Sequence, residues 1–294
     1  MKYADRTGRI QGGDTFQDCT LRLLYKSLPG RILLKPLTHP VISRIGGCFL
    51  DSSLSAFLIR PFIRSCGISL KGCEVPAGGA YRSFNACFTR SLRDKARPFP
   101  SNPDLLCSPC DGLISAYTIS RKQRFSIKNT EYTVTQLLRD DRLAARYAGG
   151  TALVIRLTVS DYHRYAYVDD GLRSSYRRIP GILHTVNPAA AASRPIYKEN
   201  TREYSLLRSR HFGTILMMEV GAMMVGRIVN HHKAYTRIDA FRGQEKGYFA
   251  FGGSTVILLL EPDRVSIDKD ILRNTALSIE TKVKMGERIG IRYI

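Results

Sequence analysis

The chain has 294 residues, of which 44% are apolar, and this is enough to bury a core as one large domain or two unequal ones. With 24 Gly, 13 Pro, no internal repeat and no low-complexity tract, the sequence excludes a disordered chain or a repeat array. The net charge of +20 predicts an anionic partner, either nucleic acid or an acidic membrane surface, with a generally basic soluble protein as the plain alternative.

Residues 1–75 are expected to form a small helical, basic region that contacts a membrane. Between residues 20 and 72 the sequence has eight Lys or Arg and one acid, Asp51, among many Leu, Ile and Phe, which is typical of interfacial segments. The prolines predict breaks between short amphipathic helices: Pro29, Pro36, Pro40 and Pro61. A helical subdomain packed on the core is the alternative, and both can hold.

Apolar residues recur at helical spacing inside this region, at Val41, Ile42, Ile45 and Phe49, and Ser53 is expected to cap a following turn. No run reaches the roughly 18 apolar residues that a spanning helix needs. A membrane contact of this chain is therefore expected to be peripheral.

The seven cysteines are odd in number and irregularly spaced, and residues 1–18 lack the apolar core of a secretory signal. We therefore expect free thiols in a reducing cytoplasm. Cys107-Ser-Pro-Cys110 is a single CxxC without a second pair, so no metal site is expected. His231 and His232 are adjacent, and neighbours on a strand point to opposite faces, which also disfavours a shared ion.

Residues 76–294 are expected to form a β-rich domain. Residues 113–119 and the alternating Leu153, Ile155, Leu157 and Val159 predict strands, as do the apolar runs 212–229 and 255–260. One helix is predicted over Thr135–Tyr147, with Gly149 beyond its end. The predicted fold class is α+β, a β-rich catalytic domain with a small helical N-terminal membrane-associating segment.

Three short stretches place reactive side chains among Gly and aromatic residues: Ser108–Gly112, Asp161–Tyr165 and Phe251–Thr255. Each alone has an ordinary explanation as a turn, a structural histidine or a loop. Together they supply Asp, His and Ser, the set in which a base activates a serine and an acid orients the base. A serine hydrolase is disfavoured because Ser254 leads into a strand, without a G-x-S-x-G elbow.

These stretches belong to a longer series of motifs that occur in one order along the chain. They are Phe88-Thr-Arg90 with Arg97-Pro98, Cys110-Asp-Gly112, Asp161-Tyr-His-Arg164, Thr185-Val-Asn-Pro188, Val220-Gly-Ala222 with Val225-Gly226, and Gly252-Gly-Ser-Thr-Val256. Between about residues 80 and 262 the sequence resembles the phosphatidylserine decarboxylase family, of the pyruvoyl-dependent prokaryotic type.

The resemblance implies a proenzyme that cleaves itself between Gly253 and Ser254. The Ser254 hydroxyl attacks the Gly253 carbonyl, and elimination and hydrolysis leave a pyruvoyl cofactor at position 254. Two adjacent glycines suit this step because they reach strained backbone conformations. The products, 1–253 and 254–294, are expected to stay associated through strand pairing.

The implied reaction is decarboxylation of phosphatidylserine to phosphatidylethanolamine, a carbon–carbon lyase reaction in which the pyruvoyl group is the electron sink. Asp111 is expected to orient or polarise the base and His163 to act as acid and base. Phe88, Arg90 and the N-terminal segment are expected to contact lipid. The expected location is the cytoplasmic face of the cell membrane, with phosphatidylserine, an anionic membrane surface and the cleaved small chain as partners. A homodimer is left open, and nucleic acid is not expected because no recognition motif is present.

One position departs from the family pattern D-Y-H-R-x-H, because its second His is Ala166 here. Either His163 serves both steps, or another His substitutes, or self-cleavage is impaired; we hypothesise that His184 takes the vacant role, while packing on the sheet is the plain alternative. Two other functions stay open: a pyruvoyl decarboxylase of a soluble amino acid, and a non-maturing homologue that binds lipid or nucleic acid.

Overall fold

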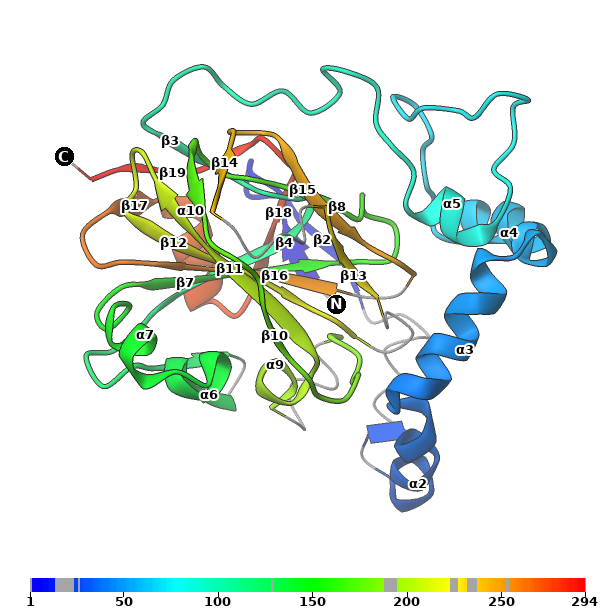
Figure 1. Ribbon diagram of the computed structural model, residues 1–294, viewed down its shortest axis with the longest axis horizontal. Helices are drawn as coiled ribbons and strands as arrows, with labels where there is room; N and C mark the ends of the chain where they lie inside the picture. Colours follow the sequence, from blue (N-terminus) through cyan, green and yellow to red (C-terminus); the bar gives the residue numbers. More distant parts are fainter. Residues whose placement is uncertain are drawn as a thin grey trace.

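The computed structural model describes residues 2–13, 24–25, 27–127, 130–187, 195–222, 227–231, 237–251 and 254–293. Its helices are α2 (Leu28–Leu37), α3 (Pro40–Asp51), the 3-10 helix η1 (Ser53–Leu58), α4 (Ile59–Ser65), α5 (Phe84–Phe88), α6 (Val134–Leu138), α7 (Asp141–Ala145), α9 (Ile196–Glu199) and α10 (Lys269–Ala276). Figure 1 shows α2–α5 beside a sheet domain that contains the other helices.

The strands are β1 (Lys2–Ala4), β2 (Ile10–Gly12), β3 (Leu105–Cys107), β4 (Gly112–Thr118), β5 (Arg124–Ile127), β6 (Thr130–Thr133), β7 (Thr151–Leu157), β8 (Arg164–Ala166), β9 (Gly171–Arg173), β10 (Arg177–Ile179), β11 (Arg202–Ser209), β12 (Thr214–Val220), β13 (Ile228–Asn230), β14 (Ile238–Ala240), β15 (Glu245–Phe249), β16 (Ser254–Leu260), β17 (Val265–Ile267), β18 (Glu280–Val283) and β19 (Arg288–Arg292). Most of them form one large sheet, in the order β14-β9-β11-β12-β16-β7-β4-β18-β1-β2.

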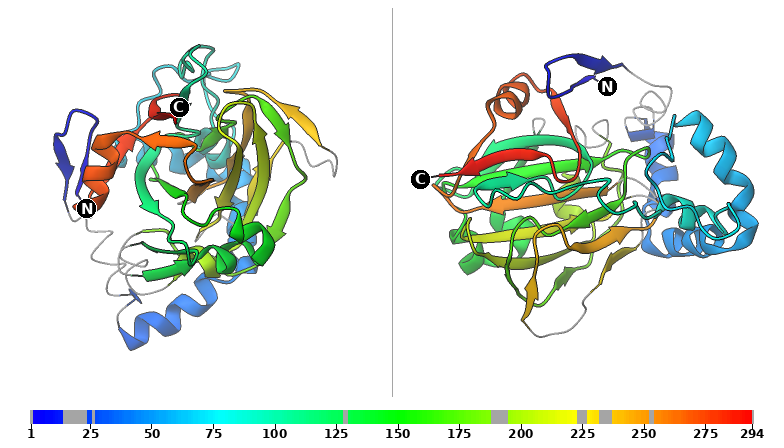
Figure 2. Two further views of the ribbon diagram at one scale, coloured as in Figure 1. Left: turned by 90° about the vertical axis from the view of Figure 1, so that its left-hand side faces the viewer. Right: turned by 90° about the horizontal axis from the view of Figure 1, so that it is seen from above.

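The centre of this sheet is buried on both faces. Val256 and Leu258 of β16 join a core that includes Tyr165, Phe249 and Ile271 of β8, β15 and α10. Ile257 and Leu259, which point to the opposite face, join a second core with residues of α6, α7 and α9. The small sheet β13-β15-β8 and α10 therefore contribute to the core on one face, and α6, α7 and α9 to the core on the other. Figure 2 shows the sheet domain from two further sides. Strands that are buried on both faces have continuous apolar sequences, as residues 255–260 do.

The α+β, β-rich fold with a small helical N-terminal region is confirmed. At the N-terminus the structure differs from the expected helical region, because residues 2–12 form β1 and β2, and β1 pairs with β18 in the large sheet. Within the helical region, Pro29 and Pro40 lie in the first turns of α2 and α3 and Pro36 lies inside α2, so these prolines begin helices as much as they separate them.

The single helix predicted over residues 135–147 is wrong. Helix α6 ends at Leu138 because Arg139 adopts a left-handed φ of 50°. Helix α7 then begins after Asp140, whose carboxylate accepts a hydrogen bond from the Leu143 N–H at 3.0 Å. Asp140 is thus a helix cap inside a stretch whose apolar pattern alone predicts one helix.

Helix α3 presents its apolar side to solvent. Val41, Ile42, Ile45 and Phe49 are between 39% and 62% exposed, while Ser43 and Leu50 face inward. Among the described residues no single helix is long and apolar enough to cross a bilayer; Val41–Asp51 and Ser53–Ser65 meet that criterion only as a pair, bent by 84°.

Candidate active site

Three neighbouring strands bring the predicted reactive segments to one edge of the large sheet. Ser254 of β16 pairs with Leu157, the last residue of β7, and Leu113 of β4 pairs with Arg156 of β7. Adjacent strands lie about 4.8 Å apart, so Ser254 and Gly112 flank the end of β7 with about 10 Å between them. The loop that continues from β7 contains His163. The three segments therefore converge where β7 ends.

Asp111 is buried and forms a two-point ion pair with a residue distant in sequence. Its carboxylate accepts hydrogen bonds from Nε and Nη2 of Arg97, at 2.9 and 2.7 Å, and from the Met285 N–H at 2.8 Å. The next residue is Gly112, where a Cβ would lie only 2.8 Å from the Arg156 carbonyl oxygen. The ion pair therefore fixes the charged Asp111 carboxylate in place. The lack of a Cβ at Gly112 allows β4 to approach β7 closely.

His163 is completely buried and held on three sides. Its ring lies 4.0 Å from that of Phe88, its carbonyl oxygen accepts a 2.9 Å hydrogen bond from the Phe249 N–H, and its Nδ1 lies 2.9 Å from the Asp161 carbonyl oxygen. A carbonyl can only accept, so this contact favours the proton on Nδ1 and leaves the lone pair of the neutral ring on Nε2. This is the tautomer that a general base requires.

Asp161 stabilises the loop that holds His163. Burial by itself raises the pKa of Asp161, but the ammonium of Lys282 and hydrogen bonds from the N–H and hydroxyl of Thr158 outweigh it and hold the pKa below its usual value. The carboxylate is therefore charged at neutral pH, and it fixes the start of the loop to β18.

Ser254 is fully buried, and its Oγ has no hydrogen-bond partner within the part of the chain that the structure describes. A buried hydroxyl without a partner costs about 1–3 kcal/mol and is rare in folded proteins. Gly253, which precedes Ser254 at the predicted cleavage site, and its neighbour Gly252 lie outside the described residues. The residue before them, Phe251, donates its N–H to Asn85 Oδ1 at 3.1 Å.

Helix α5 joins these two parts of the site. The Phe88 ring contacts both His163 and Phe251, with 5.1 Å between the centroids of Phe88 and Phe251. Phe84 lies edge-on to Phe251 at 4.8 Å. Because Phe88 is 0% exposed, it forms a wall of the site here, and its expected contact with lipid stays a prediction. Arg90, the other expected lipid contact, is 5% exposed.

His184 lies one strand beyond Ser254. Asn200 Nδ2 donates to the carbonyl oxygens of His184 and Gly221, both at 2.8 Å, and Gly221 follows Val220, which pairs with Thr255. The imidazole itself contacts Tyr25 OH at 3.2 Å and Glu199 Oε2 at 3.5 Å, and neither of these contacts is to Ser254. Ala166 is buried on β8, with its N–H bonded to the Pro109 carbonyl oxygen. The role of His184 in cleavage stays a prediction.

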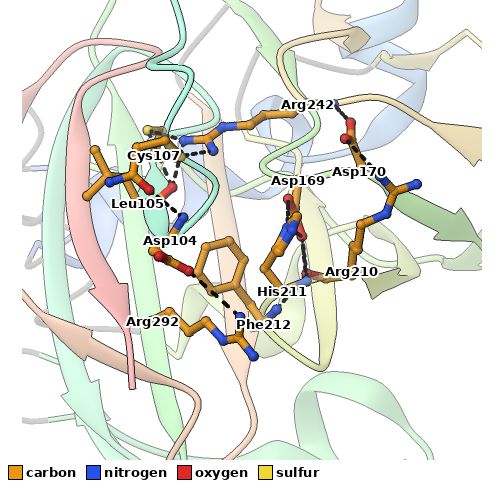
Figure 3. Close-up of polar contacts among 12 residues, drawn as sticks. Asp104, Leu105, Cys107, Asp169, Asp170, Arg210, His211, Phe212, Arg242 and Arg292 are labelled. Atoms are coloured by element: carbon orange, nitrogen blue, oxygen red, sulfur yellow. Dashed lines mark hydrogen bonds and ion pairs between the residues drawn. The ribbon is translucent and has the colours of Figure 1, made fainter. Parts of the chain in front are cut away.

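Other reactive groups lie apart from this edge. His211 Nδ1 lies 3.0 Å from the Asp169 carboxylate, and Arg242 Nη2 lies 3.1 Å from Cys107 Sγ. Figure 3 shows both contacts. His231 contacts Glu245, whereas His232 lies outside the described residues. No group of three or more His, Cys, Asp or Glu suited to a metal ion occurs in the described ranges.

Three contacting residues were missed from the sequence. Arg97 was noted only as part of a motif, and nothing in its position identified Asp111 as its partner 14 residues later. Lys282, bound to Asp161, and Asn85, bound to Phe251, carried no local signal. A weak signal for Asn85 is that it is the one polar residue in the stretch 84–88, Phe-Asn-Ala-Cys-Phe.

Comparison with known proteins agrees with this arrangement. The model of the phosphatidylserine decarboxylase family matches residues 84–291. Phosphatidylserine decarboxylase proenzyme 2 of Clostridium acetobutylicum is 41% identical over 277 residues, which cover 94% of this chain and 92% of that protein. The phosphatidylserine decarboxylase proenzyme of Ruminiclostridium cellulolyticum is 39% identical over 273 residues, covering 92% and 90%. The chain therefore belongs to the phosphatidylserine decarboxylase family.

Proposed function

We propose that this protein is a phosphatidylserine decarboxylase that matures by cleaving itself between Gly253 and Ser254. The observation that carries the proposal is the buried Ser254 Oγ, which has no partner among the described residues, at the sheet edge where His163 and Asp111 converge. A buried hydroxyl without a hydrogen-bond partner is available for nucleophilic attack once a base accepts its proton. The family to which the chain belongs supplies the reaction.

In the proposed cleavage, Ser254 Oγ adds to the Gly253 carbonyl carbon and its proton passes to a histidine base. The amide becomes an ester as the Ser254 nitrogen leaves the carbonyl and takes up a proton. Loss of the Ser254 α-proton then expels the Gly253 carboxylate, and the dehydroalanine that remains is hydrolysed to a pyruvoyl group with release of ammonia. His163 is the proposed base, because its Asp161 contact favours a lone pair on Nε2.

The surroundings of Ser254 suit a pyruvoyl group. The position is buried and bordered by the hydrophobic core, and a small planar ketone needs no charged partner of its own. When formed, the group supplies a ketone that accepts the substrate amine and withdraws electrons as CO₂ departs. His163 would hold the proton that returns to the substrate carbon, and Asp111, fixed by Arg97, would orient or polarise the base.

Intact-mass measurement under denaturing conditions tests this proposal. We expect two polypeptides that divide at 253/254, the smaller without a free amine and reactive toward a hydrazide. Ser254→Ala should remain one chain. Ser205→Ala is the matched control, because Ser205 is also buried with an Oγ that lacks a described partner, but lies on β11. An intact wild-type chain that does not react with hydrazide would refute the proposal.

We also propose that the helical region places the enzyme on the cytoplasmic face of the membrane as a peripheral protein. The α3 residues Ile45 and Phe49 are 62% and 44% exposed, and Leu54 and Phe57 of η1 are 74% and 69% exposed. Arg60 and Arg64 of α4 are exposed beside them. Large apolar side chains rimmed by arginines match an anionic bilayer surface, and the lipid substrate resides there.

Vesicle co-sedimentation tests the membrane contact. Leu54→Ser with Phe57→Ser should weaken binding to vesicles that contain phosphatidylserine, while leaving cleavage intact. Leu277→Ser is the control, because Leu277 is 63% exposed but follows α10 in the sheet domain. A decarboxylase of a soluble amino acid would instead release CO₂ from free serine and would be indifferent to these substitutions.

A further inference from the structure

A hollow of about 630 Å³ opens beside the end of α5 and takes no part in the chemistry proposed above. Three parts of the chain form its walls. The end of α5 contributes Ala86, Thr89 and Arg90, the loop that follows α4 contributes Glu74 and Tyr81, and β8 contributes Arg164. The Tyr81 hydroxyl donates to the Glu74 carbonyl oxygen at 2.8 Å, which fixes the loop across the opening. The hollow is thus a formed part of the fold.

Arg90 lines this hollow and lacks the partners that a buried guanidinium normally has. It is 5% exposed, and among the described residues its one hydrogen bond is a long one of 3.5 Å from Nη1 to the Cys87 carbonyl oxygen, while its buried Nε has no partner there. No ion pair joins Arg90 to a carboxylate within the described ranges. A buried cation in this state needs acceptors from elsewhere.

Other buried arginines of the same protein show what is missing at Arg90. Arg202 donates to four backbone carbonyl oxygens, at 2.8 to 3.0 Å. Arg156 forms a two-point pair with Glu280. Arg173 also has an Nε and an Nη2 without a partner among the described residues, but it does not line this hollow. Arg90 is therefore a buried guanidinium whose open donors lie where a ligand from outside the chain can reach them.

The charge of the hollow selects the chemistry of that ligand. Arg93 also lines it and is exposed at the rim, whereas Arg164 is already paired with Glu245 at 2.8 Å and bonded to the Thr89 carbonyl oxygen. Glu74 is the one acidic residue among the lining residues. Guanidinium groups bind phosphate and carboxylate oxygens in a bidentate geometry, so two of them lining one hollow favour an anionic ligand, and a phosphate group is the anion that links the headgroup of the proposed lipid substrate to its glycerol.

The hollow adjoins the candidate active site. Thr89 and Arg90 follow Phe88, whose ring contacts His163, and Arg164 follows His163 directly. We propose that this hollow binds a phosphate group through Arg90 and Arg93. This inference rests on the proposed function, in which the phosphate group is the headgroup phosphodiester of the lipid. Free inorganic phosphate has the same chemistry and is the other possible source of the phosphate group.

Steady-state kinetics of the matured enzyme tests the site with two probes, dihexanoyl phosphatidylserine below its micellar concentration and inorganic phosphate as an inhibitor. Arg90→Gln should raise KM by about tenfold or more with a smaller change in kcat, and should weaken phosphate inhibition by a similar factor. Arg90→Lys should restore part of both. Arg82→Gln is the matched control, because Arg82 is exposed in the preceding segment but does not line the hollow; it should change neither value by more than about twofold.

The outcomes separate the two sources. If both KM and phosphate inhibition shift, the ligand is the headgroup; if phosphate inhibition weakens while KM stays, the ligand is free phosphate. Values that match the wild type in both assays for Arg90→Gln overturn the site. Should Arg90→Gln not fold, Arg93→Gln at the rim should still shift at least one of the two values by severalfold, and no shift overturns the site.

The test also stays separate from the proposed function. If the wild type does not decarboxylate the lipid, that proposal fails. Calorimetric titration of inorganic phosphate into Ser254→Ala, with and without Arg90→Gln, then decides the phosphate site alone: heat that depends on Arg90 supports it, and its absence overturns it.

Discussion

The buried pair Lys246–Glu219 offers the sharpest test of how the catalytic sheet is held together. Both side chains are 0% exposed, and Lys246 Nζ lies 2.6 Å from Glu219 Oε1 and 3.1 Å from Asn230 Oδ1. Glu219 stands directly opposite Val256 on β16, two residues from Ser254. The pair therefore joins β12 and β15 beside the strand that begins with Ser254, the proposed nucleophile.

Removing one partner leaves the other charge buried without compensation. We expect Glu219→Gln or Lys246→Met to cost about 3–5 kcal/mol in the free energy of unfolding, whereas Glu219→Leu combined with Lys246→Met should recover most of it. Asn230 keeps other partners in the double variant, because its Nδ2 donates to Glu203 at 3.0 Å. At about 2–4 °C per kcal/mol, the single variants should melt roughly 6–20 °C below the parent.

The two single variants should respond to pH in opposite directions. Burial lowers the pKa of Lys246 and raises that of Glu219, and loss of the partner enlarges either shift. In Glu219→Gln the unfolded state binds more protons at Lys246 than the folded state does, so stability should recover as pH rises toward 10.5. In Lys246→Met the folded state binds more protons at Glu219, so stability should recover as pH falls toward 4.5.

Thermal unfolding of these variants in a Ser254→Ala background, where the chain stays whole, measures both effects. Glu131→Gln is the control, because its partner Arg124 is 59% exposed and the pair should contribute less than about 1 kcal/mol. The reasoning is refuted if the double variant melts as low as the single ones, or if both single variants shift with pH in the same direction.

Substitutions at three further positions examine the site itself. Arg97→Ala removes the bidentate partner of the Asp111 carboxylate, so maturation, followed by intact mass, should slow by about tenfold or more. Arg97→Lys should retain part of the rate. An unchanged rate in Arg97→Ala would show that Asp111 does not need this partner. His163→Ala should abolish maturation, and the same loss in His184→Ala would support its substitution for the His replaced by Ala166; normal maturation of His184→Ala together with failure of His163→Ala would exclude that substitution.

Local sequence patterns predicted the parts of the fold that depend on local physics. The alternating apolar residues 153–159 predicted β7, and the apolar run 255–260 predicted β16. These patterns are informative because the spacing of apolar residues reflects whether one or both faces of a strand are buried. Helix α3 also follows its pattern, but its apolar side is exposed. A helical period gives the apolar face of a helix and leaves open what covers that face, so the pattern alone does not choose between packing on the core and contact with a membrane.

The contacts of the site depend on distant pairings and were beyond sequence reasoning. Asp161 and Lys282 are 121 residues apart, and Phe251 and Asn85 are 166 apart. Each pair meets because β7, β16 and β18 lie close together in one sheet and α5 packs at its edge. The motifs predicted the reacting groups, whereas the residues that contact these groups follow from strand order, which no local pattern encodes.

The same strand order predicts what cleavage does to the molecule. Residues 254–294 supply β16, which pairs with β12 on one side and β7 on the other, and β18 and β19, which pair with β4 and β3 of the larger chain. All seven residues of β16 are buried. Breaking one peptide bond at the end of a central strand leaves these ladders intact, so the two chains should elute together in native gel filtration at the volume of uncut Ser254→Ala. They should separate only in denaturant, and loss of the small chain under native conditions would contradict the central position of β16.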